Sequence, residues 1–196
     1  MKKLQIAVIG SAGNEEYPFR KPAQAMFAAA EKIGRLLAEN NCIVINGGKG
    51  GVMEAVCRGA KSADGLTVAE VAGDGRLTSN DYVDIEVVTT DVGFRGPSSL
   101  IGMSDAVISL GGGAGTLQEI AVAYRMKKPI IFLMGYGGWT DRIEEDYLDE
   151  RNLVKIVRTS SEEDAVKYAL KNSKVALAAI RSRLQLTDKD DRITTL

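Results

Sequence analysis

The stretch DAVISLGGGAGTLQE, residues 105–119, joins a short apolar run to a glycine-rich loop and an amphipathic segment. The apolar run 106–110 predicts a buried strand. A helix is expected to start near Gly115, with one apolar face formed by Leu117, Ile120, Ala121 and Tyr124. A buried strand that enters a helix through glycines is typical of an α/β fold with a parallel sheet.

The same alternation of apolar runs and helical patterns extends in both directions. The other predicted strands cover residues 4–10, 42–46, 66–71, 85–89, 130–134 and 153–157. A long amphipathic helix between the first two has one apolar face formed by Met26, Ala30, Ile33 and Leu37. We therefore predict a doubly wound, Rossmann-like parallel sheet with helices on both faces. Residues 1–186 are expected to form a single nucleotide-binding-type domain, and the polar residues 187–196 a frayed tail.

Two helical stretches are expected near the C-terminus. One begins at Ser161 and ends near Ala169, and a second follows Asn172 and Ser173. The second has an apolar stripe formed by Leu177, Ile180 and Leu184. This stripe either packs against the sheet or forms a contact between subunits.

Composition excludes several classes of function. The 196 residues include 25 Lys+Arg and 26 Asp+Glu, so the net charge is −1 and does not favour nucleic-acid binding. The chain has no histidine, which excludes His-dependent nucleophilic catalysis and His-ligated metals, and we predict no metal site. No apolar run approaches the about 20 residues that span a membrane. We expect a cytoplasmic protein in which Cys42 and Cys57 are buried and reduced.

Three glycine-containing loops follow predicted strands, and they indicate a ligand site. Parallel strands end at one edge of a sheet, where ligands bind at the point at which strand order reverses. Two of these loops each open a helix, whose N-terminal N–H groups and dipole attract phosphate. Tight turns alone are the alternative explanation of these glycines. The predicted phosphate- and ligand-binding residues are Gly10, Ser11, Gly47, Gly48, Gly51, Gly112, Gly113, Gly115 and Thr116.

Two common phosphate-binding motifs do not fit these loops. A Walker A loop needs Ser or Thr after its lysine, and here Gly50 follows Lys49. A dinucleotide fingerprint needs GxGxxG after the first strand and an acidic residue at the end of the second strand, where this chain has Asn46. The sequence therefore predicts neither a P-loop NTPase nor an ordinary NAD enzyme.

Two motifs resemble those of the "lonely guy" cytokinin-riboside-monophosphate phosphoribohydrolases. Residues 111–119, GGGAGTLQE, are similar to the signature PGGxGTxxE, and residues 47–55, GGKGGVMEA, are similar to GGxxGxMxA. The resemblance covers about residues 4–157. The superfamily also contains molybdenum-cofactor carrier proteins and chains labelled "possible lysine decarboxylase". Residues 137–143, GGWTDRI, resemble the subgroup nearer the carriers.

The resemblance implies cleavage of the N-glycosidic bond of a nucleoside 5′-monophosphate, which releases base and ribose 5-phosphate. Glu119 would supply the catalytic carboxylate, Arg95 a cationic partner, and the glycines the phosphate site. Arg95 lies ten residues before Asp105 and is followed by Gly96, whereas the hydrolases have Arg-Lys with the arginine nine residues before the aspartate. The family proline is also replaced, by Gly111.

The alternative is a non-catalytic carrier with molybdenum cofactor, which bears a phosphate, as cargo. Trp139 and Arg142 would then be neighbours of the ligand, or simply a packing residue and a solvated one. Neither function requires a resident cofactor, and no pyridoxal-binding framework supports a true lysine decarboxylase. The resemblance also implies a homo-oligomer, either a dimer or a tetramer.

Glu119 has a structural alternative as well. The segment from Thr116 to Glu119 matches a helix capping box, in which both side chains accept backbone N–H groups at the start of a helix.

Overall fold

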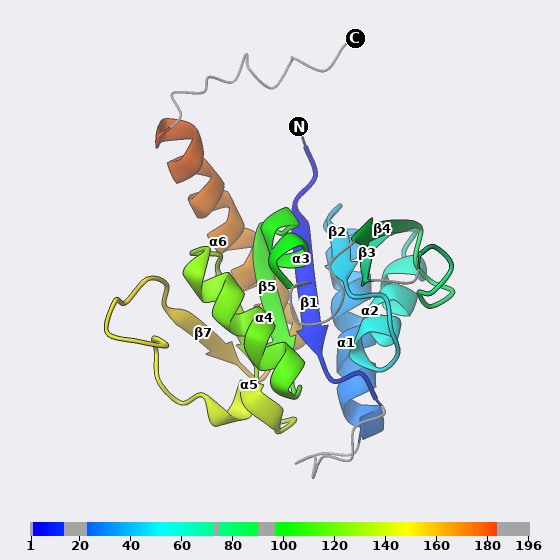
Figure 1. Cartoon of the computed structure of the whole chain (residues 1–196), viewed down its shortest axis with the longest axis horizontal. Helices are drawn as coiled ribbons and strands as arrows, with labels where there is room; N and C mark the ends of the chain where they lie inside the picture. Colours follow the sequence, from blue (N-terminus) through cyan, green and yellow to red (C-terminus); the bar gives the residue numbers. More distant parts are fainter. Residues whose placement is uncertain (1, 14–22, 73–74, 90–96, 184–196) are drawn as a thin grey trace.

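The described residues contain seven strands, which form one parallel sheet in the order β4-β3-β2-β1-β5-β6-β7 (Figure 1). The computed structural model describes residues 2–13, 23–72, 75–89 and 97–183. The strands are β1 (Gln5–Gly10), β2 (Ile43–Asn46), β3 (Leu66–Ala72), β4 (Ile85–Thr89), β5 (Ala106–Leu110), β6 (Ile130–Leu133) and β7 (Ile156–Thr159). The helices are α1 (Ala23–Glu39), α2 (Val52–Lys61), α3 (Pro97–Met103), α4 (Ala114–Arg125), α5 (Gly138–Arg142) and α6 (Glu162–Arg183).

Two apolar clusters cover the two faces of this sheet. In β1, Ile6 and Val8 belong to the cluster that includes α1, α2 and α6, whereas Ala7 and Ile9 belong to the cluster with α3 and α4. A strand that is buried on both faces is uniformly apolar, which is the pattern that the sequence has. The predicted doubly wound α/β fold is confirmed.

The last strand lies a few residues later than predicted. The strand expected over 153–157 is β7 (Ile156–Thr159), and Ile156 pairs in register with Ile130 of β6. The backbone N–H of Leu153 instead donates to the Tyr124 hydroxyl at 3.1 Å. Leu153 and Val154 therefore do not join the sheet but pack against the apolar cluster to which α4 contributes.

Between residues 161 and 183, the structure shows one helix where two were predicted. α6 continues through Asn172 and Ser173, where a break was predicted. The Asn172 side chain donates to the carbonyl of Tyr168 one turn earlier, at 2.9 Å, and Ser173 is buried. These polar side chains are thus accommodated within the helix, so they do not end it. Leu184 and the predicted tail 187–196 lie outside the described residues.

Among the described residues, none of the helices has the length and apolar character required to cross a membrane.

Candidate functional site

The strand order reverses between β1 and β5. From β1 the chain continues through β2, β3 and β4 on one side, and β5 then pairs with the other side of β1. Gly10 and Leu110, the last residues of these two strands, are register partners. The loops after β1, β2 and β5 therefore meet at the carboxyl edge of the sheet, where doubly wound folds bind ligands.

The loop after β1 is packed tightly against the start of α2. The N–H of Val52 donates to the carbonyl of Ser11 at 2.9 Å, and Ser11 is fully buried. Gly51 has a φ of 66°, and a Cβ atom there would lie 2.4 Å from the same carbonyl oxygen. At Gly10, a Cβ atom would lie 2.3 Å from the carbonyl oxygen of Leu110. Gly10, Ser11 and Gly51 therefore allow close contact between backbone segments.

The loop after β2 is held by two asparagine side chains. The N–H of Gly48 donates to Oδ1 of Asn46 at 2.7 Å, and Asn46 is fully buried. The carbonyl of Gly48 accepts from the side-chain amide of Asn80 at 3.1 Å and from its backbone N–H at 2.7 Å. The first turn of α2 also contains an acidic residue, Glu54, which opposes a bound anion at that helix end. Beside it, Gly47 lies near Met53, whose sulfur is 3.2 Å from a Cβ atom built on the glycine.

The loop after β5 accepts hydrogen bonds from residues of α5. The carbonyl of Gly112 accepts from the N–H of Trp139 at 2.9 Å, and that of Gly111 accepts from the Thr140 hydroxyl at 2.8 Å. The Trp139 ring packs against the apolar cluster and lies 5.5 Å from the Arg142 guanidinium. These contacts give Trp139 the packing role that was the alternative to ligand contact.

The first two residues of α4 are open to solvent, whereas the third, Thr116, is buried. Gly113 is the N-cap, Ala114 and Gly115 are exposed, and a Cβ atom at Gly115 would meet nothing within 4 Å. The first turn contains no acidic residue. Helical geometry leaves the N–H groups of residues 114–116 without acceptors inside the helix, and the helix dipole places positive charge there. This helix end has the features of an anion-binding site.

The capping box predicted for Thr116 and Glu119 is wrong. The N-cap is Gly113, so Thr116 is already the third helical residue and no side chain caps the helix. The loop glycines cause this difference, because they let the helix begin three residues earlier than the motif suggests. Glu119 lies in the second turn and has no capping role.

Glu119 is half-buried and near a second carboxyl group. Burial, followed by the charge of Glu70 on β3, raises the pKa of Glu119 from about 4.5 to about 8. Glu119 is therefore mostly protonated at neutral pH, and it can donate a proton as well as accept a hydrogen bond.

Glu70 is a residue that the sequence reasoning missed. Its Oε1 atom accepts hydrogen bonds from the hydroxyls of Ser99 (2.6 Å) and Thr89 (3.2 Å). A single acidic residue within the apolar run of β3 was the signal that could have found it. Arg95, the predicted cationic partner of Glu119, lies outside the described residues.

Neither metal ligands nor reactive thiols gather at this edge. The described part of the chain has no group of three or more Cys, Asp or Glu residues that could hold a metal. Cys42 and Cys57 are free and buried, and burial raises the pKa of each thiol to about 11. Asn46 donates to the sulfur of Cys57 at 3.1 Å. Both cysteines are therefore packing residues.

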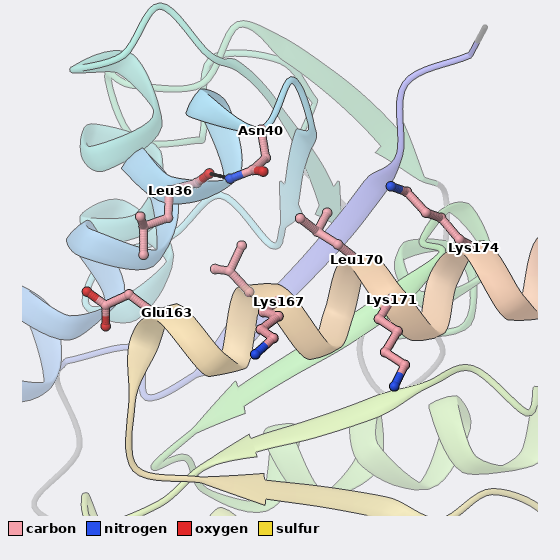
Figure 2. Close-up of a pocket in the computed structure, with 8 residues that line it drawn as sticks. Leu36, Asn40, Glu163, Lys167, Leu170, Lys171 and Lys174 are labelled. Atoms are coloured by element: carbon pink, nitrogen blue, oxygen red, sulfur yellow. Dashed lines mark hydrogen bonds between the residues drawn. The ribbon is translucent and has the colours of Figure 1, made fainter.

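A hollow of about 660 Å³ lies between α1 and α6, away from the glycine loops. Figure 2 shows Leu36 and Leu170 on its inner side and the ammonium groups of Lys167 and Lys171 directed away from them. The Asn40 side chain at its end donates to the carbonyl of Leu36 at 2.8 Å. The hollow is lined by Leu36, Asn40, Glu163, Val166, Lys167, Leu170, Lys171 and Lys174. It is an open groove between two helices and lacks the convergent polar groups of a ligand site.

The comparisons with known proteins agree with this architecture. The model of the SLOG cluster4 family matches residues 3–166. The chain belongs to this family. A relative of this SLOG chain from Archaeoglobus fulgidus is 42% identical over 133 residues, which are 68% of this chain and 82% of the relative.

Two solved structures are similar in fold to this SLOG cluster4 chain. The structure of TM1055 is 34% identical with a TM-score of 0.78, and the match covers 86% of this chain and 99% of that one. The molybdenum cofactor binding protein from the phototrophic bacterium Rippkaea orientalis is 30% identical with a TM-score of 0.73, covering 89% and 99%. The predicted resemblance to the superfamily of lonely-guy enzymes and molybdenum-cofactor carriers is confirmed.

Proposed function

We propose that this chain binds a small phosphorylated heterocycle at the edge of the sheet where β1, β5 and α4 meet. The carrying observation is the first turn of α4, in which Ala114 and Gly115 are exposed, Thr116 is buried, and no side chain is acidic. Charge-assisted hydrogen bonds from such a helix end to a phosphate contribute about 1.5–3 kcal/mol each. Phosphate binding should therefore dominate the affinity.

A phosphorylated pterin of the molybdenum-cofactor type is the proposed ligand class, held without turnover. The likeness to the molybdenum cofactor binding protein of Rippkaea orientalis supports this choice. Two sequence departures also favour a carrier over a hydrolase: Arg95 is displaced by one residue from the hydrolase register, and Gly96 stands where a lysine is expected.

Hydrolysis of a nucleoside 5′-monophosphate is the second candidate, and the protonation of Glu119 favours it. A departing base needs a proton as its glycosidic bond breaks, and a carboxylic acid with a pKa near 8 holds one at neutral pH. Glu119 would then act as a general acid rather than as a charged stabiliser of the sugar cation.

A product assay separates these two functions. The chain is incubated with AMP and with GMP, and chromatography measures free base and ribose 5-phosphate. If the chain is a carrier, no base is released, while molybdopterin raises the melting temperature of the protein. If the chain is a hydrolase, Glu119→Gln lowers the rate by roughly 10²–10⁴-fold. Glu39→Gln, on the exposed end of α1, serves as the matched control and should leave the rate unchanged.

The chain is also expected to form a homo-oligomer. The last turns of α6 extend beyond the sheet (Figure 1), and there Val175 and Ile180 are 62% and 42% exposed. Of the two roles considered for the stripe near Leu177, these exposed apolar side chains support the contact between subunits.

A further inference from the structure

Glu70 contains a buried oxygen atom without a partner. The residue is 6% exposed, and its Oε1 atom accepts the two hydroxyl donors of Ser99 and Thr89. Its Oε2 atom is inaccessible to solvent and has no hydrogen-bond partner among the described residues. Buried carboxylate oxygens are rarely left unpaired, because the lost hydration is not replaced. This atom therefore lacks a hydrogen-bond donor, which a ligand that reaches it would supply.

Glu119 and Glu70 lie on the same side of the sheet. Helix α3, which contains Ser99, packs against both β3 and α4, the elements that bear the two glutamates. The two groups are close enough for the charge of Glu70 to raise the pKa of Glu119, which is therefore in its acid form at neutral pH. The pair offers acceptor oxygens from both side chains and one O–H donor from Glu119.

The pair lies at a suitable distance from the anion site of α4. Glu119 is six residues after the N-cap Gly113, which corresponds to about 9 Å along the helix axis. A ligand whose phosphate contacts the first turn of α4 can therefore extend its ring along the helix toward Glu119.

We propose that Glu70 and Glu119 together recognise the 2-amino-4-oxopyrimidine edge that guanine and pterins share. Glu70 Oε2 accepts from the exocyclic amino group, and the Glu119 carboxyl group pairs with the ring N–H and the carbonyl. This inference rests on the proposed function, because it assumes that a phosphorylated heterocycle binds at the N-terminus of α4. It assigns the selectivity among such heterocycles to Glu70.

The test compares GMP with IMP, which differ only in the 2-amino group. Both are titrated calorimetrically against the full chain at pH 7. We expect GMP to bind about tenfold more tightly, which is about 1.4 kcal/mol. Glu70→Gln should reduce this ratio to less than about threefold while leaving the IMP affinity nearly unchanged. The control Glu39→Gln should retain the wild-type ratio.

The outcomes distinguish this inference from the function on which it rests. Equal binding of GMP and IMP to the wild-type chain overturns the role of Glu70 but leaves the phosphate site intact. The same conclusion follows if Glu70→Gln retains the full ratio. Binding of none of AMP, GMP, IMP and molybdopterin rejects the proposed function itself. The ratio of the GMP and IMP affinities of the wild-type chain tests the inference without any variant. The test therefore remains decisive even if the Glu70→Gln chain misfolds.

Discussion

The two glycine loops that open α2 and α4 look alike in sequence but differ in three dimensions. The first N–H of α2 is donated to the carbonyl of Ser11, and Glu54 already places an acidic side chain in that first turn. The first turn of α4 has exposed residues at 114 and 115 and no acidic side chain. Gly51 serves close backbone packing, whereas Gly115 leaves the start of α4 accessible.

This difference shows that a glycine motif alone does not define a phosphate site. A helix end binds an anion when its N–H groups are free, its surroundings are open and no carboxylate competes for its dipole. Only the α4 end meets these conditions among the two loops. We therefore assign the anion site to α4 and a scaffolding role to the loop before α2.

The first expected effect is on the free energy of unfolding, and it compares Gly51 with Gly115. Gly51→Ala should lower the free energy of unfolding by at least about 2 kcal/mol, because φ is positive and the new Cβ would meet the Ser11 carbonyl. Gly115→Ala should raise it by about 0.5–1 kcal/mol, because alanine favours the helix and its Cβ meets open space. Urea denaturation measures both. Equal effects would show that the loops are equivalent.

The sheet could be predicted almost completely from the sequence, because strands buried on both faces are short uniform apolar runs. All seven strands were placed, with β7 shifted by a few residues. Helices α3 and α5 were not predicted, since they are short and lack a long apolar period. The break expected at Asn172 was wrong because the side chain bonds within the helix.

The site was less predictable, because its properties depend on contacts between distant segments. The Ser11 carbonyl, which accepts from Val52, and the Asn80 side chain, which donates to the carbonyls of Gly48 and Lys49, decide that the loop before α2 is packed, and both lie outside the motif. The protonation of Glu119 depends on burial and on Glu70, which is 49 residues away in the sequence. Local patterns identify the loops but do not show which helix end is open.

The second prediction concerns the raised pKa of Glu119 on α4, and Glu54 on α2 provides the comparison. Its pKa is about 8 in the folded chain and near 4.5 when unfolded, so the folded state binds the proton more tightly. Stability should therefore decrease as the pH rises from about 4.5 to 8, by at most about 1.4 kcal/mol per pH unit, and level off above.

Glu119→Gln should flatten this decrease, so that at pH 8 the variant melts at a higher temperature than the wild type. Thermal melts at pH 5, 6.5 and 8 provide the measurement. Glu54→Gln in the first turn of α2 is the control and should keep the wild-type slope. An unchanged slope in Glu119→Gln would contradict the assigned protonation.

The third and smallest effect tests whether a single chain supplies the whole ligand site at the N-terminus of α4. Ile180→Glu places a charge on the exposed apolar end of α6 and should raise the dissociation constant of the oligomer at least tenfold, as measured by light scattering. AMP affinity should change by less than about threefold. A wild-type chain that is already monomeric at micromolar concentration would refute the oligomer, and loss of AMP binding on dissociation would show that a second copy completes the site.

The central claim is that the α4 helix end, and not the α2 end, holds the phosphate. The most direct measurement is the shift in melting temperature caused by AMP and by adenosine in the wild type, Gly115→Asp and Glu54→Gln. We predict that AMP stabilises the wild type and Glu54→Gln equally, that adenosine stabilises neither, and that Gly115→Asp loses the AMP shift while remaining folded. Equal shifts from AMP and adenosine, or an undiminished AMP shift in Gly115→Asp, would contradict this account.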